Sequence, residues 1–126
     1  NKIKIQSIKD DLIKNISSQN DINNFIGEID LDPKSIKELC FILSDKFENL
    51  FLILISKSDE KVFISCFISK NLIEEKELNA SKIIRELSPL INGSGGGQPF
   101  FATGGGTNKN GIDQVILKSK KIITQL

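Results

Sequence analysis

Four parts of the chain place apolar residues three or four positions apart, which is the spacing of one face of a helix. They predict helices over residues 1–17, 33–47, 80–88 and 111–126. Asp32 and Pro33 favour the start of the second helix, because aspartate caps free amide groups and proline at the first helical position loses no hydrogen bond. Asn79 can cap the third helix, and Pro89 is expected to end or kink it near Ser88.

Other stretches have the patterns of strands. Residues 25–31 alternate between apolar and polar side chains. Residues 50–55 are continuously apolar, which is typical of a strand covered on both faces. A polar turn over residues 57–61 and a β-rich run over 62–68 follow, so a hairpin is expected there.

Strands with intervening helices predict an α+β fold. We expect a single mixed sheet of about four strands with amphipathic helices packed on it, a glycine-rich loop before the last helix, and a leading helix. Residues 1–19 are predicted to be the end of a helical spacer or dimerisation segment, and residues 20–126 one globular domain. The leading apolar stripe is formed by Ile5, Ile8, Leu12 and Ile16, and it is too short to predict a coiled coil alone.

The most unusual segment has seven glycines between Gly93 and Gly106. Glycine is required where φ is positive, or where a backbone or ligand approaches too closely for a Cβ atom. One such use is a cradle of backbone amides that binds phosphate oxygens. The segment is not a Walker A loop, since no Lys-Ser/Thr pair follows the glycines, and it is not a dinucleotide-binding GxGxxG motif. Residues 99–102 are expected to form a short strand between two glycine turns, and both a shaped backbone surface and a simple surface loop stay open.

The composition excludes several kinds of chemistry. With 126 residues, 39% hydrophobic and 26% charged, the chain has the size and balance of one globular domain. The count of zero histidines excludes Ser-His-Asp and Cys-His nucleophiles and histidine-based zinc sites. Cys40 and Cys66 are too few for a disulfide framework, which fits a reducing compartment, and both fall in apolar stripes, so they are predicted to be packed core thiols.

Two features that the sequence lacks bear on where the protein is located in the cell. No apolar run reaches the length of a membrane span, so we expect no membrane partner. The chain also lacks methionine and a signal-peptide pattern. We therefore expect it to be the tail of a longer cytoplasmic protein.

Positive charge is concentrated near the C-terminus. The net charge of the whole chain is only +1. Residues 93–126 contain one acid, Asp113, and four lysines, a net charge of +3. The lysines are Lys109, Lys118, Lys120 and Lys121. Such a segment is either a solvated helix face or a modest track for phosphates.

The glycine-rich run closely resembles a signature near the C-terminus of alanyl-tRNA synthetases. That signature has a glycine triplet, a variable residue, proline, two variable residues, alanine and a second glycine cluster, as in residues 95–106 here. The order of predicted elements also resembles the family's C-terminal, DHH-associated-type domain from about residue 22 to 126. It includes a hairpin that ends in Ser69-Lys70 and a helix that begins near Ala80.

Some positions depart from the family's usual pattern. Gln98 stands where a basic residue is common, Thr103 where glutamine is common, and Phe100-Phe101 replace a more polar pair. Glutamine can hydrogen-bond to a phosphate but cannot neutralise it.

The resemblance implies a tRNA-binding accessory domain of a bacterial alanine–tRNA ligase, which helps position alanine tRNA for aminoacylation and editing. It implies that this chain is not an enzyme alone and holds no catalytic or metal-binding residue and no cofactor. ATP, magnesium and the zinc of the editing domain would be bound by upstream parts of an ATP-dependent parent enzyme.

The candidate tRNA contacts are glycine backbones that approach the RNA and lysines that add salt-sensitive attraction. They are Gly95, Gly96, Gly97, Gln98, Gly104, Gly105, Gly106, Lys109, Lys118 and Lys121. A second set of basic candidates consists of Lys70, Lys82 and Arg85. Phe100 or Phe101 either stacks on a base or, as we favour, packs in the core.

Two alternatives remain. The chain could be the substrate-binding domain of a DHH-family phosphoesterase, although those proteins place a histidine after the glycine triplet, where this chain has Gln98. It could instead serve chiefly as a dimerisation module, with a homodimer of the parent formed through the N-terminal helix and its stripe of isoleucines and leucine.

Overall fold

The computed structural model describes residues 2–126, with side chains from residue 3 onward. Its α-helices are α1 (Lys2–Asn15), α2 (Pro33–Ser44), α3 (Lys70–Lys76), α4 (Ala80–Leu87) and α5 (Ile112–Thr124). Its strands are β1 (Ser17–Gln19), β2 (Ile22–Glu28), β3 (Leu50–Ser58), β4 (Lys61–Ile68), β5 (Ser94–Gly97) and β6 (Phe101–Gly106). Two short 3₁₀ helices are η1 (Ser88–Ile91) and η2 (Lys109–Gly111).

All strands in the described residues belong to one mixed sheet in the order β1-β2-β3-β4-β6-β5. β2 and β3 run parallel and are connected by α2, and every other pair of neighbours is antiparallel. The predicted α+β class and mixed sheet are therefore confirmed. The sheet has six strands, however, rather than about four.

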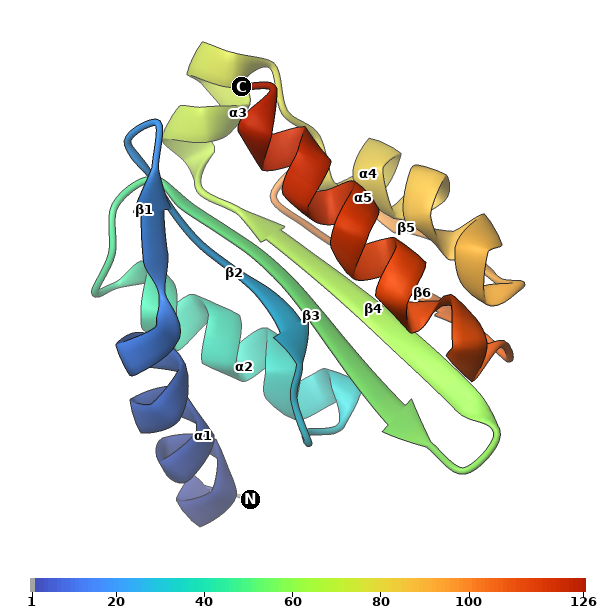
Figure 1. Cartoon of the computed structure of the whole chain (residues 1–126). Coiled ribbons are helices and arrows are strands. Elements are labelled where there is room, and N and C mark those ends of the chain that lie inside the picture. The colour runs from blue at the N-terminus through green and yellow to red at the C-terminus, as the bar shows by residue number, and fades with distance from the viewer. Residues whose placement is uncertain (1) are drawn as a thin grey trace.

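Helices cover both faces of the sheet (Figure 1). The side chains of β3 show which helices cover which face, because successive side chains of a strand point to opposite faces of the sheet. Leu50, Leu52 and Leu54 pack with residues of α1 and α2, whereas Phe51 and Ile53 pack with residues of α3, α4 and α5. The continuously apolar run thus forms a strand buried on both faces, as predicted.

The predicted helix starts are confirmed by their capping bonds. The Ser35 amide donates to the Asp32 carboxylate at 3.3 Å. Hydrogen bonding to the Ser35 side chain, and to a smaller extent to this amide, lowers the pKa of Asp32. The Lys82 amide donates to the Asn79 side chain at 3.2 Å. α4 ends before Pro89, where the chain continues as η1.

Besides the two short 3₁₀ helices, three elements were not predicted. The first is β1, which joins β2 through Asn20 and Asp21, with φ angles of 56° and 64°. Asparagine and aspartate tolerate the left-handed region, as a tight turn of this kind requires. The others are α3, at residues 70–76, and β5, at residues 94–97.

The prediction for residues 99–102 was wrong in its details. The glycines on either side are not turns but strands: β5 and β6 pair with each other as a hairpin. The connection is the segment 98–100, and Phe101 and Ala102 already belong to β6. The strand predicted over 25–31 also lies earlier, at Ile22–Glu28.

Candidate functional site

The candidate site is the glycine hairpin, defined as residues 93–106, with β5 at the edge of the sheet. Its tip, residues 98–100, is fixed by backbone hydrogen bonds to other elements. The Ala80 amide donates to the Pro99 carbonyl at 2.8 Å, and the Ile68 amide donates to the Phe100 carbonyl at 2.9 Å. Such bonds are typical of an ordered segment, so the simple flexible loop is excluded.

Helix α4 lies over β5 and β6 and is bonded to the hairpin near both of its ends. The Gly97 amide donates to the Ser81 hydroxyl at 3.3 Å. The Gly93 amide donates to the Ser88 carbonyl at 2.9 Å. Strand and helix therefore form one packed unit at this edge.

The glycines permit this close packing. A Cβ atom on Gly104 would overlap the Ser88 hydroxyl oxygen and lie 3.0 Å from the Ile84 methyl carbon Cγ2. A Cβ atom on Gly106 would overlap the Ile91 carbonyl oxygen. Gly104 is itself buried under α4. Several of these glycines are thus required by packing inside the chain, because α4 and η1 lie too close to the sheet for a Cβ atom.

Two glycines in the hairpin leave room for a side chain. A Cβ atom on Gly105 would lie 3.5 Å from the nearest atom of Phe63. A Cβ atom on Gly96 would lie 3.5 Å from the Ser81 hydroxyl and 3.8 Å from Arg85 Nε. These are ordinary contacts, so packing inside the chain does not require glycine at either position. Arg85, the one arginine of the sequence, lies beside β5 and next to the candidate glycines.

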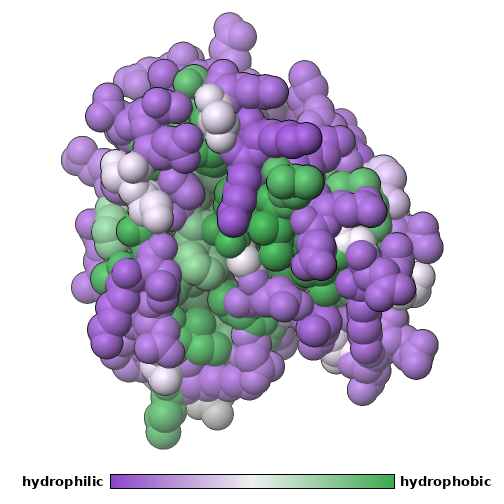
Figure 2. Space-filling view, viewed as in Figure 1, coloured by the Kyte–Doolittle hydropathy of each residue, from purple (hydrophilic) through white to green (hydrophobic). Residues whose placement is uncertain are grey.

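The candidate cations lie on four helices, α3, α4, η2 and α5, rather than in one cluster. Lys82 and Arg85 are exposed on α4, and Lys118 and Lys121 are exposed on α5, which contacts α4 on the same face of the sheet. Polar side chains cover most of the face seen in Figure 2, with hydrophobic ones between them. Within the described residues none of these four cations forms a salt bridge.

The remaining candidate side chains surround the glycine hairpin at other points. Gln98 is exposed at the tip. Lys109 is exposed on η2, just after β6. Lys70 is exposed at the first position of α3, directly after β4.

The two phenylalanines next to the tip differ in exposure. Phe101 is 9% exposed and packs in the core under α2, as favoured from the sequence, whereas Phe100 is 41% exposed. The sequence did not single out Phe41, which is 40% exposed on α2 and lies 6.3 Å from Phe100 between ring centroids. Phe41 follows the buried stripe of α2 by a single position, so its exposure could have been inferred from the helical period.

The two cysteines have no reactive character. Both thiols are buried, Cys40 on the inner side of α2 and Cys66 in β4 on the opposite face of the sheet. Burial raises the pKa of Cys40 to about 12 and raises the pKa of Cys66 as well, so both stay protonated at neutral pH. This confirms the prediction of packed core thiols.

The predicted apolar stripe of the leading helix packs inside the chain. Ile5 and Leu12 are buried against residues of α2, while Ile8 and Ile16 are half-buried in the same cluster. The side chains that suggested a homodimer are thus largely covered by this chain's own helix. The homodimer stays a prediction.

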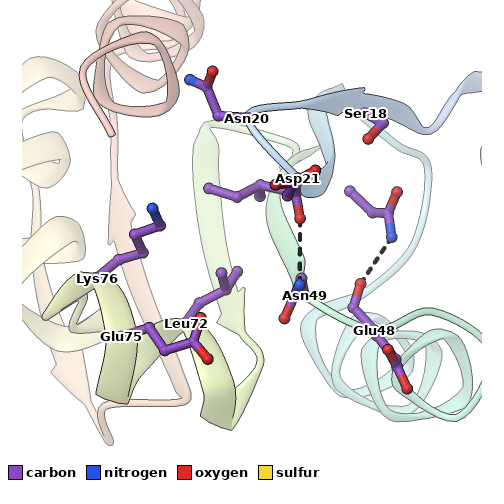
Figure 3. A pocket seen from close by; sticks show the side chains of 10 residues that line it. Ser18, Asn20, Asp21, Glu48, Asn49, Leu72, Glu75 and Lys76 are labelled. Atoms are coloured by element: carbon purple, nitrogen blue, oxygen red, sulfur yellow. Dashed lines mark hydrogen bonds between the residues drawn. The ribbon is translucent and has the colours of Figure 1, made fainter.

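A polar pocket of about 470 Å³ lies where β1 and β2 meet α3 (Figure 3). Asp21, Glu48, Glu75 and Lys76 line it. Its walls are fixed by the Asn49 side chain, which donates to the Asp21 carbonyl at 3.3 Å. In the part of the chain that the structure describes, no group of three metal-ligating side chains occurs, in this pocket or elsewhere. No helix among these residues has the length and apolar character of a membrane span.

The fold and the glycine hairpin define an α+β domain with a glycine-rich, helix-covered sheet edge. The chain belongs to the DHHA1 domain family, which it matches over residues 13–125.

Curated relatives with similar sequences are alanine–tRNA ligases. The enzyme of Christiangramia forsetii is 40% identical over 122 residues, which cover 97% of this chain and 14% of the relative. The enzyme of Cytophaga hutchinsonii is 41% identical over 121 residues, which cover 95% of this chain and 14% of the relative. The chain therefore spans about one seventh of the length of these ligases.

Solved structures share the fold. The C-Ala domain from Aquifex aeolicus alanyl-tRNA synthetase superimposes with a TM-score of 0.74 at 22% identity, covering 86% of this chain and 98% of that domain. A DHH domain described as a member of the s1p family of ribosomal proteins gives a TM-score of 0.58 at 14% identity, covering 94% of this chain and 30% of that chain.

Proposed function

We propose that this chain is a tRNA-binding accessory domain of an alanine–tRNA ligase. The observation that carries the proposal is the 40% identity to such a ligase over 97% of the chain. On this proposal, the domain does no chemistry itself and holds alanine tRNA while other parts of the ligase charge and edit it. ATP, magnesium and zinc belong to those other parts.

The glycine hairpin supports this role by its position and rigidity. β5 lies at the sheet edge, and its residues Gly95 and Gly97 are exposed. An edge without side chains lets an RNA backbone approach the protein backbone closely, and Arg85 beside β5 can pair with phosphates through its planar guanidinium group.

The exposed lysines support a salt-sensitive contribution. Lys118 and Lys121 lie on α5, next to the helix that carries Lys82 and Arg85. None of the four is neutralised by a salt bridge inside the described residues, so each is available to a phosphate. With a net charge of only +1 for the whole chain, we expect modest affinity for an isolated domain and a larger effect when it is tethered to a ligase.

Titration with a transcript of alanine tRNA at several salt concentrations tests the proposal. We expect binding at low salt. We expect the double variant Lys118→Gln with Lys121→Gln to make the negative slope of log K against log salt shallower by about 2. The matched control is Lys14→Gln with Lys61→Gln, which removes the same charge from exposed lysines on α1 and at the start of β4. If the unmodified chain bound no tRNA at low salt, the proposal would be wrong.

Gly96→Ala tests the role of the hairpin itself. Packing leaves room for this methyl group, so we expect unchanged stability. If RNA approaches the strand there, the added group weakens tRNA binding, and amide chemical shifts of residues 94–98 change on titration with the tRNA. Equal affinity for both forms would exclude Gly96 from the contact surface.

A further inference from the structure

An aromatic groove opens beside the tip of the glycine hairpin, on the face of the sheet that carries α2. It has a volume of about 370 Å³. Phe41 and Phe100 border it, with ring centroids 6.3 Å apart and ring planes inclined by 54°. Phe67 lies behind Phe41 in an edge-to-face contact at 5.8 Å. Phe41 is thus packed on a buried ring, and Phe100 lies next to Phe41.

The polar groups of the groove differ in their availability. The Ser69 hydroxyl accepts from the Leu50 amide at 2.8 Å, and the Ser44 hydroxyl donates to the Phe41 carbonyl at 2.8 Å. Lys70 and Asn71 also line the groove, and within the described chain neither side chain has a hydrogen bond or an ion pair. An ammonium group and an amide are therefore free to contact a ligand.

Two cations lie near the aromatic rings, one in the groove and one outside it. Lys70 lines the groove itself, and Lys37 Nζ lies 5.6 Å from the ring centroid of Phe101, next to Phe41. The one carboxylate that lines the groove, Glu48, also lines the polar pocket of Figure 3, so it lies on the boundary between the two. Aromatic rings close to cations suit a ligand with a flat π system and a negative charge.

The exposed apolar area is too small for a second copy of the chain. A phenylalanine has on the order of 200 Å² of surface to bury, so two rings that are 40% and 41% exposed offer roughly 160 Å². A stable dimer buries about 800 Å² on each partner. A single flat ring system is an occupant of the right size.

We propose that this groove binds an unpaired nucleobase of the RNA. The base stacks on Phe100 and Phe41, Asn71 contacts its polar edge, and Lys70 neutralises an adjacent phosphate. The inference rests on the proposed function, and it adds a base-stacking site on the α2 face of the sheet, opposite to the lysines of α5.

Replacing the exposed rings tests the stacking site. For Phe41→Leu and Phe100→Leu we expect affinity for a transcript of alanine tRNA to fall at least about fivefold, with the salt slope unchanged, because stacking releases no counterions. For Lys70→Gln we expect the magnitude of the salt slope to decrease by about 1. The matched control is Leu117→Ala, which removes an exposed apolar side chain from α5. Backbone amide spectra of each variant verify that it is folded.

A short single-stranded RNA that carries 2-aminopurine provides a direct signal, since stacking on a ring quenches its fluorescence. We expect quenching by the unmodified chain and by Leu117→Ala, and its loss with Phe100→Leu. Unchanged tRNA affinity and quenching in both phenylalanine variants would overturn the stacking site while leaving the proposed function intact. Failure of the unmodified chain to bind any tRNA would overturn both. If the variants altered self-association instead of RNA binding, a second copy would be the occupant and the nucleobase assignment would be wrong.

Discussion

The two hairpins β3–β4 and β5–β6 lie in the same sheet but are stabilised in opposite ways. In β3, residues 50–56 are all buried, and β4 contributes a further row of buried apolar side chains. β5 has no side chain larger than that of Ser94, and its pairing with β6 is covered by α4. The first hairpin is stabilised by burial of side chains, and the second by the fit of one backbone against another.

The comparison shows why a stable domain can have a glycine-rich edge. Glycine is unfavourable in strands because it gains nothing from side-chain packing and loses more conformational entropy. The apolar hairpin and its helices supply the stability, so the glycine hairpin can keep a shape that side chains would prevent. Substitutions should therefore destabilise the two hairpins for different reasons. In β3–β4 the cause is lost burial of side chains, and in β5–β6 it is steric overlap with the packed backbone.

The largest effect is expected from Ile53→Ala in β3. Ile53 is fully buried, so its truncation leaves a cavity and should destabilise the chain by about 2–5 kcal/mol. Ile53→Val is the matched control, at about 0.5–1.5 kcal/mol. Urea unfolding followed by circular dichroism measures both, since the chain has neither tryptophan nor tyrosine. A loss below 1 kcal/mol for the alanine variant would contradict the proposed basis of stability.

A smaller effect is expected from Gly104→Ala in β6. The new methyl group would overlap the Ser88 hydroxyl and press on Ile84, which should destabilise the chain by about 1–3 kcal/mol. Gly105→Ala is the neighbouring control, because its methyl group comes no closer than 3.5 Å to any atom, the nearest being in Phe63, and its effect should stay within about 0.5 kcal/mol. The same unfolding experiment compares them.

A second measurement identifies the atom responsible. In a Ser88→Ala background the nearest obstacle to the Gly104→Ala methyl group is gone, so part of the lost stability should return. If Gly104→Ala cost the same in both backgrounds, or no more than Gly105→Ala, the close approach of α4 would not be the reason for glycine at this position.

The smallest effect is expected from Asn79→Ala, which removes the cap of α4. Loss of an N-cap bond should destabilise the chain by about 0.5–2 kcal/mol. Because α4 lies directly on β5 and is bonded to the glycine hairpin, we expect a larger increase in amide hydrogen exchange at residues 94–97 than in β3. An equal increase across both hairpins would contradict their independence.

Much of the fold follows from local signals in the sequence. The cap of α2 at Asp32, the cap of α4 at Asn79 and the continuously apolar β3 could all be predicted, because each depends on residues that are close together in the chain. Asn20-Asp21 was also such a signal, for a tight turn with positive φ, and it was overlooked.

The strands of the glycine hairpin could not be predicted in this way. Local propensity argues against a strand at residues 94–97, which is formed by pairing with β6 and by the cover of α4, and β6 is in turn paired with the distant β4. The same holds for the aromatic groove, where Phe41 and Phe100 are far apart in sequence and adjacent in space. The sequence could identify the glycines and lysines as candidates, but whether they contact tRNA stays a prediction.

The bonds at both ends of α4 have a consequence for local unfolding of the domain. The Ala80 amide is bonded to the tip at Pro99, and the Ser88 carbonyl is bonded to Gly93 at the base of the hairpin. Local opening of the tip or of the edge strand therefore has to break a hydrogen bond to the helix between them. Bonds of this kind make the three parts a single unit of local unfolding, in which the backbone amides of each are protected by the other two.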